Sequence, residues 1–200
     1  MAHINRETVE RRHERLLEEY GTDGVELVEK RWESPPEEFE EFADLSRAGY
    51  VGGGYCWVTR TAEQFAALTE SMPESAAPDP DEERALMILN RDLHSWGVAG
   101  GGREADETFE EAAVREVREE TGVDCEVTDL FRVEHATRRC TAPDDDRVCH
   151  MLFVFFDADY AGGEIRVQPG ELHGAAWFRD APSRVDDAAQ KRAEEWFDER

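Results

Sequence analysis

The alternation of apolar and polar residues divides the chain into segments with the periods of helices and of strands. Apolar residues three or four positions apart predict helices over residues 7–20, 62–72, 109–121 and 183–200. Apolar runs bounded by Gly, Pro, Asn or Asp predict strands over residues 49–61, 84–92, 148–158, 163–168 and 175–180. Residues 125–140 are predicted to form either a pair of strands or one long bent strand.

The order of these elements predicts an α/β fold, in which an α/β/α sandwich holds a mixed β-sheet flanked by helices. Residues 1–48 differ from the rest: they are acidic, and "SPPEEFEEF" predicts a proline-marked turn into a further short helix. We therefore expect an acidic, helical N-terminal extension over residues 1–48 and a larger domain over residues 49–200.

The charge of the chain is extreme and is spread along its whole length. Its 200 residues include 48 Asp and Glu but only 23 Lys and Arg, a formal net charge of −25. Because the acids do not gather in one tail, we expect a protein whose self-repulsion is screened by concentrated salt, in a haloarchaeal type of cytoplasm. The same excess, without a basic stripe, argues against binding nucleic acid through its phosphates.

The cysteines and the termini bear on the compartment. Cys56, Cys125, Cys140 and Cys149 show neither C-x-x-C pairing nor zinc spacing, so we expect small buried thiols in a reducing compartment. The sequence shows no apolar leader and no run of eighteen apolar residues, so we expect a cytoplasmic protein without a signal peptide or membrane span. His94, His135, His150 and His173 lie in no motif, and we expect them to serve packing or the surface.

The helix predicted over residues 109–121 carries its carboxylates on an unexpected face. At about 100° per residue, Glu120 lies about 40° to one side of Glu116 and Glu119 about 60° to the other. The apolar residues of the first turns share this side: Phe109, Ala112, Ala113 and Val117. A solvated charged face should lie opposite the apolar stripe, and crowded carboxylates repel one another unless a cation lies among them. The pattern therefore predicts a site for Mg²⁺, or for Mn²⁺, since hard ions prefer carboxylate oxygens.

The residues around this helix predict a shaped site. Thr108 and Glu111 have the spacing of a capping box, and Gly122 is placed to end the helix as its C′ residue. Glu107 then lies in the loop just before the helix, and the glycines at 100–102 allow the backbone to approach a ligand closely.

The stretch from Gly101 to Val123 resembles the signature box of the Nudix hydrolases. That pattern is G, five residues, E, seven residues, then R-E-U-x-E-E-x-G-U, where U is aliphatic. Its fixed positions are filled by Gly101, Glu107, Arg115, Glu116, Val117, Glu119, Glu120, Gly122 and Val123. The preceding "WGVAGG" is similar to the family's W-x-x-P-G-G motif, with Ala99 in place of proline. The resemblance covers about residues 49–198, with residues 62–83 as an insertion between the first two strands.

The resemblance implies an enzyme that hydrolyses the pyrophosphate bond of a nucleoside diphosphate linked to another group, with Mg²⁺ as its cofactor. By position, Glu116, Glu119 and Glu120 resemble the metal-binding carboxylates, and the carbonyl of Gly100 resembles a further ligand. Arg115 resembles the residue that orients the glutamates of the box.

For other roles that the resemblance implies, more than one residue or interpretation is open. Arg115 is expected to act foremost on Glu107. The general base is either Glu119, within the box, or Glu171, in the "GELHGAAWF" stretch that precedes a late strand. Arg138 and Arg139 are candidates for contact with substrate phosphates, although a plain surface pair is the simpler interpretation.

The substrate stays open at this level. The markers typical of ADP-sugar, dinucleoside polyphosphate, NADH ("SQPWPFP") and coenzyme A subclasses are absent after the box. By elimination we expect a (d)NTP or an oxidised nucleotide, with ADP-ribose or another nucleotide sugar as the alternative. A regulatory module that senses a nucleotide without hydrolysing it is the non-enzymatic alternative, disfavoured because every glutamate of the box is retained. The expected partner is a small nucleotide, and residues 1–48 are a candidate surface for homodimerisation.

Overall fold

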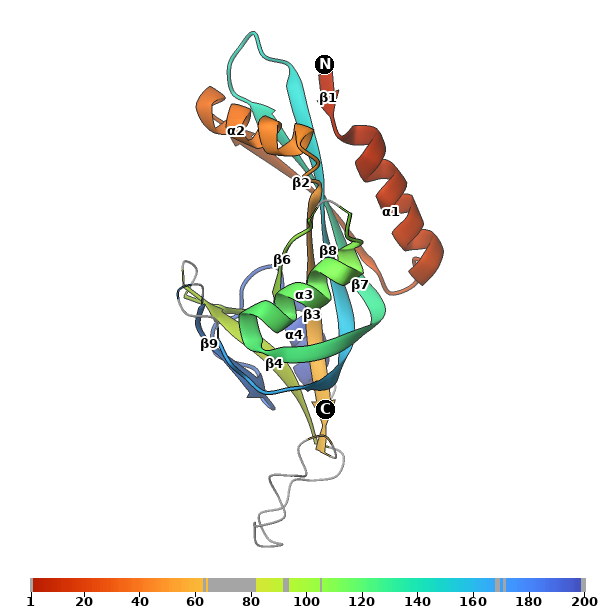
Figure 1. The fold of residues 1–200 in the computed structure, drawn as a ribbon, viewed down its shortest axis with the longest axis vertical. Helices are drawn as coiled ribbons and strands as arrows, with labels where there is room; N and C mark the ends of the chain where they lie inside the picture. Colours follow the sequence, from red (N-terminus) through yellow and green to blue (C-terminus); the bar gives the residue numbers. More distant parts are fainter. Residues whose placement is uncertain are drawn as a thin grey trace, which may run out of the picture. The chain divides into compact units, whose positions relative to one another are not determined.

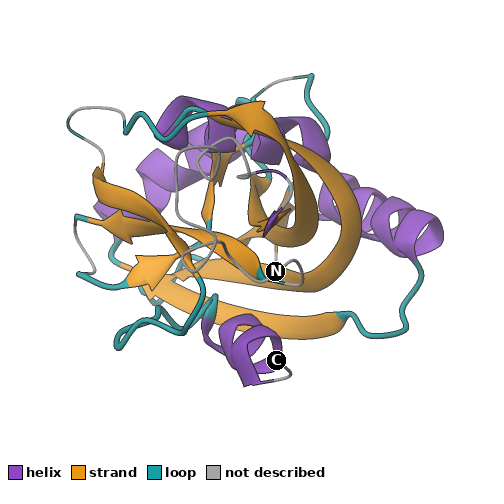
Figure 2. Cartoon of the chain, turned by 90° about the horizontal axis from the view of Figure 1, so that it is seen from below, coloured by secondary structure: helices purple, strands orange, loops and turns teal. Residues whose placement is uncertain are grey.

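The computed structural model describes residues 2–62, 64, 82–91, 94–104, 106–167, 170 and 172–198. Within these residues the chain forms a mixed β-sheet flanked by helices, which confirms the predicted α/β class (Figure 2). The helix predicted over 62–72, nearly all of the proposed insertion, and Glu171 lie outside the described residues.

The chain forms two compact units, each assembled from three stretches of sequence. The first unit contains Met1–Tyr55, Gly101–Ala113 and Asp129–Phe156. The second unit contains Cys56–Gly100, Val114–Thr128 and Asp157–Arg200.

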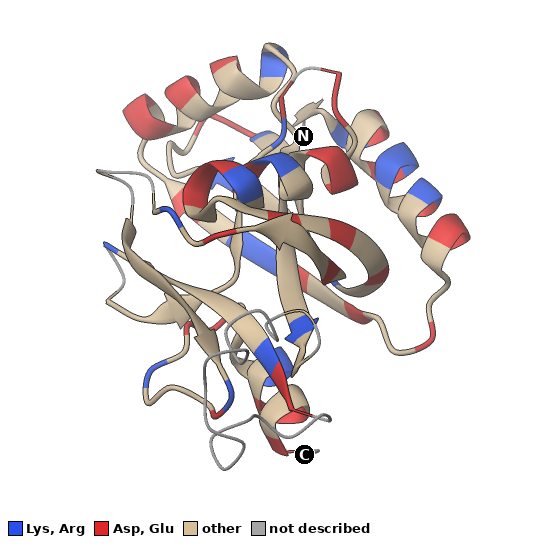
Figure 3. Ribbon diagram, turned by 60° about the horizontal axis from the view of Figure 1, so that its bottom comes forward, with Lys and Arg blue, Asp and Glu red and all other residues tan. Residues whose placement is uncertain are grey.

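The first unit begins with an N-terminal segment in which strands and helices alternate. Its elements are β1 (Ala2–Ile4), α1 (Arg6–Tyr20), β2 (Glu26–Ser34) and α2 (Pro36–Arg47). β1 pairs in parallel with β8 (Arg147–Gly163), and β2 pairs in parallel with β7 (Val123–Cys140). β7 is a single strand, which settles the choice left open over residues 125–140. Helices α1 and α2 lie on opposite sides of the strands of this unit (Figures 1 and 3).

Strand β2 was not predicted: the expected helical extension contains the strands β1 and β2 as well as the helices α1 and α2. Its side chains alternate between half-buried positions, such as Val28 and Trp32, and exposed positions, such as Leu27 and Glu29. This is the period of a strand with one covered face, but charged residues on both faces conceal it in the sequence. The separation of residues 1–48 from the rest of the chain stays a prediction.

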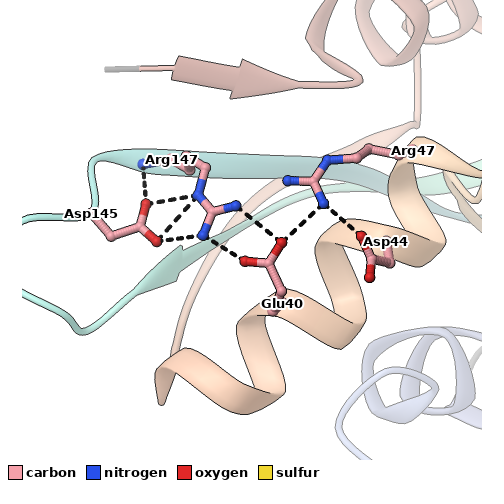
Figure 4. Close-up of polar contacts among 5 residues, drawn as sticks. All are labelled: Glu40, Asp44, Arg47, Asp145 and Arg147. Atoms are coloured by element: carbon pink, nitrogen blue, oxygen red, sulfur yellow. Dashed lines mark hydrogen bonds and ion pairs between the residues drawn. The ribbon is translucent and has the colours of Figure 1, made fainter.

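An ion-pair network fixes α2 to the turn between β7 and β8 (Figure 4). Arg147 contacts Asp145 Oδ2 at 2.7 Å and Glu40 Oε2 at 2.6 Å. Arg47 contacts Glu40 Oε1 at 3.0 Å and Asp44 Oδ1 at 2.6 Å. The hydrogen bonds from the Arg147 side chain hold the pKa of Asp145 well below its usual range. The network lies at the surface, so its value lies more in setting the orientation of α2 than in stability.

The second unit is organised around β4 (Glu83–Asn90), which confirms the strand predicted over 84–92. β4 pairs antiparallel with the end of β3 (Gly52–Thr61), with β5 (Trp96–Gly97) and with β9 (Leu172–Phe178). Near the C-terminus, α4 (Gln190–Asp198) supplies Trp196, whose ring lies 5.9 Å from that of the buried Trp57.

Two predicted elements of the second unit were wrong in type or extent. Residues 164–167 form no strand; instead the amide of Arg166 donates to the carbonyl of Thr121 at 2.6 Å. The C-terminal helix begins at Gln190 rather than near 183, because the preceding residues pair with β5. The Trp96 amide donates to Arg184 O at 2.8 Å, and Trp96 forms a parallel bridge with Val185. Among the described residues, no helix is both long and apolar enough to cross a membrane.

Candidate active site

The helix that carries the clustered glutamates, α3, spans Phe109–Thr121 as predicted. The capping box is present: the Thr108 amide donates to Glu111 Oε2 at 2.8 Å, and the Glu111 amide donates to Thr108 Oγ1 at 3.1 Å. At the other end Gly122 adopts a φ of 77°, and its amide donates to the carbonyl of Arg118 at 2.8 Å. A left-handed glycine after the last turn ends the helix there.

The apolar face of α3 is fully buried, and part of it packs on the glycine-rich start of β3. The buried side chains are Phe109, Ala112, Ala113 and Val117. A Cβ atom on Gly54 would lie 2.2 Å from the carbonyl oxygen of Phe109 and 3.1 Å from Cβ of Ala113. The glycine therefore allows the strand backbone to lie directly against the first turns of the helix.

Two of the predicted metal ligands share one guanidinium. Nη1 of Arg115 lies 2.8 Å from Oε1 of Glu116 and 3.0 Å from Oε2 of Glu119. The side chain of Glu116 is 20% exposed and that of Glu119 is 55% exposed, so the pair reaches from the buried edge of α3 to solvent. A cation thus already lies between the two carboxylates, as their crowding requires.

The third predicted carboxylate is held by the glycine-rich strand β6 (Ala99–Gly102). The amide of Gly100 donates to Oε2 of Glu120 at 3.0 Å, which brings residues twenty positions apart into contact. Gly100 has a φ of 152°, a conformation that side-chain-bearing residues rarely adopt. The contact brings Gly100 to the last turn of α3, whereas the role of its carbonyl as a further ligand stays a prediction.

The donor set suits a hard divalent ion, but the side chains are not arranged as a finished metal cage. Within the described part of the chain, no group of three or more His, Cys, Asp or Glu side chains is placed to hold a metal ion. Glu116 and Glu119 are engaged by Arg115, and Glu120 by Gly100. Carboxylate and carbonyl oxygens are the ligands that Mg²⁺ prefers, so a bound ion would have to replace the guanidinium.

The loop before α3 is organised by an arginine that the sequence motifs did not indicate. Arg103 is only 6% exposed, and its Nη1 donates to the carbonyls of Glu104 and Glu107, each at 2.7 Å. Oε2 of Glu107 accepts a hydrogen bond from the Glu104 amide at 3.0 Å. Glu107 therefore helps to shape this loop, whereas the expectation that Arg115 orients it stays a prediction. The available signal was an arginine directly after three glycines, where free carbonyls need donors.

Comparison with known proteins identifies the family. The family model of the NUDIX domain matches residues 76–198. The chain belongs to the NUDIX domain family. This confirms the resemblance carried by the box, and α3 is its Nudix helix.

Curated relatives of this Nudix domain share its sequence over part of their length. "NAD-capped RNA hydrolase NudC" of Pasteurella multocida (strain Pm70) is 36% identical over 96 residues, which cover 46% of this chain and 33% of the relative. The protein of the same name from Pectobacterium carotovorum subsp. carotovorum (strain PC1) is 38% identical over 139 residues, which cover 63% of this chain and 50% of that relative. The chain thus spans half or less of the length of these relatives.

Similarity to solved structures is more distant. A MutT NUDIX hydrolase from Burkholderia pseudomallei aligns with 71% of this chain and 95% of its own, at 21% identity and a TM-score of 0.46. This level of likeness carries no inference about the substrate. The relatives named above are bacterial and do not support the expected archaeal source.

The remaining predicted site residues of the Nudix domain fall in different surroundings. The guanidinium of Arg138 lies 4.5 Å from the ring centroid of Phe42 and 5.5 Å from that of Trp32, so it packs on the N-terminal segment. Arg139 is exposed. Glu171 lies outside the described residues, so the choice of general base between it and Glu119 stays a prediction.

Three histidines of the first unit form a hydrogen-bonded chain that no sequence motif indicated. His3 Nδ1 lies 2.8 Å from His150 Nε2, and His150 Nδ1 lies 3.0 Å from His135 Nε2. His135 Nδ1 in turn lies 3.3 Å from Oε1 of Glu29. Burial, together with the nearby charges of His135, His3 and Arg6, lowers the pKa of His150 to about 4. The expected packing role of His150 is confirmed, since it is 5% exposed.

Proposed function

We propose that this Nudix domain hydrolyses the pyrophosphate bond of a nucleoside diphosphate-linked substrate and that it uses Mg²⁺, with Mn²⁺ as a substitute. The observation that carries the proposal is the carboxylate cluster of α3. Glu116 and Glu119 share one guanidinium, and Glu120 is fixed by the Gly100 amide. A helix whose acids are only for solubility would not hold three of them against a cation and a glycine loop.

The residues of the cluster have distinct proposed roles. Glu116, Glu119, Glu120 and the Gly100 carbonyl would hold the ion, which supplies charge neutralisation at the phosphates and a more acidic water. Arg115 keeps Glu116 and Glu119 together and would have to give up these contacts to a bound ion.

The proton of the attacking water needs a base within hydrogen-bonding reach. Glu119 is our first choice, because its carboxylate is the more exposed of the two that share Arg115. Glu171 is the alternative. Of the two candidate phosphate contacts, we favour Arg139 over Arg138, whose guanidinium already packs on aromatic rings.

We infer that the preferred substrate is a dinucleotide of the NAD type. The support comes from the relatives, which are named as NAD-capped RNA hydrolases. In that reaction, water adds across the P–O–P bridge of NAD and releases nicotinamide mononucleotide and AMP. The chain lacks the "SQPWPFP" marker of the NADH subclass, so its recognition of the base must differ. A (d)NTP or an oxidised nucleotide, and ADP-ribose or another nucleotide sugar, remain the alternatives.

We further propose that the free dinucleotide is preferred over one linked to RNA. The net charge is −25, and acidic residues, red in Figure 3, are spread over the helices. An RNA body would be repelled by this surface, whereas a dinucleotide brings only two phosphates, which the metal neutralises. The same charge supports our inference of a salt-adapted cytoplasmic protein, although the relatives named above are bacterial.

The test is a hydrolysis assay in molar KCl with Mg²⁺ or Mn²⁺. The panel contains NAD, ADP-ribose, dGTP, 8-oxo-dGTP and a short RNA with an NAD cap. Products are separated by chromatography and identified by mass spectrometry. We expect metal-dependent release of AMP and nicotinamide mononucleotide from NAD, and slower turnover of the capped RNA. Turnover of only another member of the panel would contradict the proposed substrate but support pyrophosphate hydrolysis. Binding of a nucleotide with no product from any member would establish the regulatory module instead.

A further inference from the structure

The N-terminal helix α1 is joined to the first turn of the Nudix helix by a bidentate ion pair. Nη1 and Nη2 of Arg15 donate to Oε1 and Oε2 of Glu110 at 2.8 and 2.9 Å. The hydroxyl of Tyr20, at the end of α1, donates to the same Oε1 at 3.3 Å. Glu110 is the second residue of α3, so the contact holds the first turn of the helix.

The contact is well placed to fix the angle at which α1 and α3 meet. The side chain of Glu110 is only 17% exposed, and that of Arg15 is 38% exposed. Burial would raise the pKa of Glu110, but the hydrogen bonds from Arg15, from its own backbone and from Thr108 outweigh it and hold this pKa below its usual value. The carboxylate is therefore charged, and it lies at the positive end of the helix dipole. Parallel hydrogen bonds from a planar guanidinium also restrain the angle at which the two helices meet.

Helix α1 is itself anchored in the first unit, so it can act as a fixed reference. Val9 and Leu16 are fully buried. The Asn5 side-chain amide donates to the carbonyl of Tyr50 at 2.8 Å, and the ring of Tyr20 packs on that of Phe156 at 5.8 Å. A displacement of Glu110 would have to break these contacts or the ion pair.

The glutamates of the Nudix box lie further along the same continuous helix. Glu116, Glu119 and Glu120 follow Glu110 by six, nine and ten residues. At about 1.5 Å of rise per residue, these carboxylates lie only a few turns from Glu110. Because the helix is continuous, the direction of its first turn sets where they lie. A ligand displaced by about 1 Å is enough to weaken metal binding and catalysis strongly.

We propose that Arg15 is a positioning residue: through Glu110 it sets the orientation of the Nudix helix and hence the geometry of the metal-binding carboxylates. The inference rests on the proposed function. It gives the N-terminal segment, which lies outside the matched residues 76–198, a role in the reaction. It distinguishes Arg15 from arginines of α1 that serve only the surface.

The experiment compares single variants of the full chain with a charge exchange. Arg15→Ala and Glu110→Gln break the contact, Arg15→Lys keeps the charge but not the bidentate geometry, and Arg15→Glu with Glu110→Arg exchanges the partners. Arg6→Ala is the matched control, because it removes an exposed ion pair with Glu10 within α1. For each, kcat, KM for NAD, the Mg²⁺ concentration for half-maximal activity and Tm are measured in molar KCl. Mn²⁺ affinity is measured separately, without substrate, by electron paramagnetic resonance.

We expect Arg15→Ala to lower kcat about tenfold to a hundredfold and to raise the half-activating Mg²⁺ and the Mn²⁺ Kd about tenfold. KM for NAD should stay within about twofold, since no substrate contact is lost. Arg15→Lys should be intermediate, the exchange should recover most of the loss, and Arg6→Ala should match wild type. Unchanged Mg²⁺ and Mn²⁺ dependence in Arg15→Ala, with a lower Tm alone, would overturn the inference. If wild type hydrolyses nothing, the proposed function fails, and the Mn²⁺ titration still decides whether Arg15 positions the carboxylates.

Discussion

The backbone amide of Gly100 lies 3.0 Å from Oε2 of Glu120 and donates a hydrogen bond to it. This single contact joins strand β6, which contains Gly100, to the last turn of the Nudix helix. It fixes the position of a carboxylate that we propose as a metal ligand.

Replacement of Gly100 tests this contact. At a φ of 152° an alanine is strained, so Gly100→Ala should destabilise the fold by about 1–3 kcal/mol or shift the loop away from Glu120. Either response should weaken Mn²⁺ binding, measured by titration below the melting temperature. Gly174→Ala is the control, because its Cβ would meet no atom within 4 Å. Equal Mn²⁺ affinity in the two variants would show that the loop is not part of the site.

Arg115 should compete with the metal ion. Its guanidinium contacts Glu116 and Glu119 at 2.8 and 3.0 Å. Arg115→Ala should therefore raise Mn²⁺ affinity without substrate, by about twofold to fivefold, the usual contribution of an ion pair that solvent still reaches. The measurement is a Mn²⁺ titration followed by electron paramagnetic resonance. Weaker binding in this variant would instead favour a purely orienting role for the arginine.

The histidine chain should make stability depend on pH. The folded-state pKa of His150 is about 4, against 6.5 for the free side chain. Between these values the unfolded chain binds a proton that the folded chain does not, so the free energy of unfolding should fall as pH falls from 6.5 toward 4. His3, His135, Arg6 and Glu10 are the charged or titratable groups that act on it.

Urea unfolding at pH 7 and pH 5 measures this effect. The loss of stability should be smaller in His150→Gln than in wild type, because the variant has no proton to gain at this position. His173→Gln, which changes an exposed histidine, should behave as wild type. An identical loss in His150→Gln and wild type would mean that His150 does not titrate in this range.

Salt should stabilise the protein. With a net charge of −25, self-repulsion is strong at low salt. Raising KCl from 0.1 to 1 M shortens the screening length from about 10 to about 3 Å, so Tm should rise steadily over this range and beyond. Sucrose of equal osmolality, which does not screen charge, is the control for general exclusion effects. A Tm that is flat in KCl would contradict the proposed salt adaptation.

The features that the sequence predicted well are those written in neighbouring residues. The bounds of α3 follow from Thr108, Glu111 and Gly122, which act on the backbone within one turn. Its buried face follows from helical spacing alone. The box itself is a contiguous motif, so its residues alone are enough to indicate the family.

The features that the sequence could not predict depend on contacts between distant segments. β2 is recognisable only beside β7, because its charges conceal its covered face. The late start of α4 depends on the bridge between Trp96 and Val185. Likewise Arg15 and Glu110 are 95 residues apart, and each alone resembles any other surface charge of an acidic chain.

The central claim is that the carboxylates of α3 hold the metal that drives hydrolysis. The most direct test is Mg²⁺-dependent release of AMP from NAD by Glu120→Gln, compared with Glu126→Gln, which changes an exposed glutamate of β7. Glutamine can still accept the Gly100 hydrogen bond, while the negative charge is removed. We predict a rate at least about 10²-fold below wild type for Glu120→Gln and no change for Glu126→Gln. Equal rates in the two variants would contradict the account.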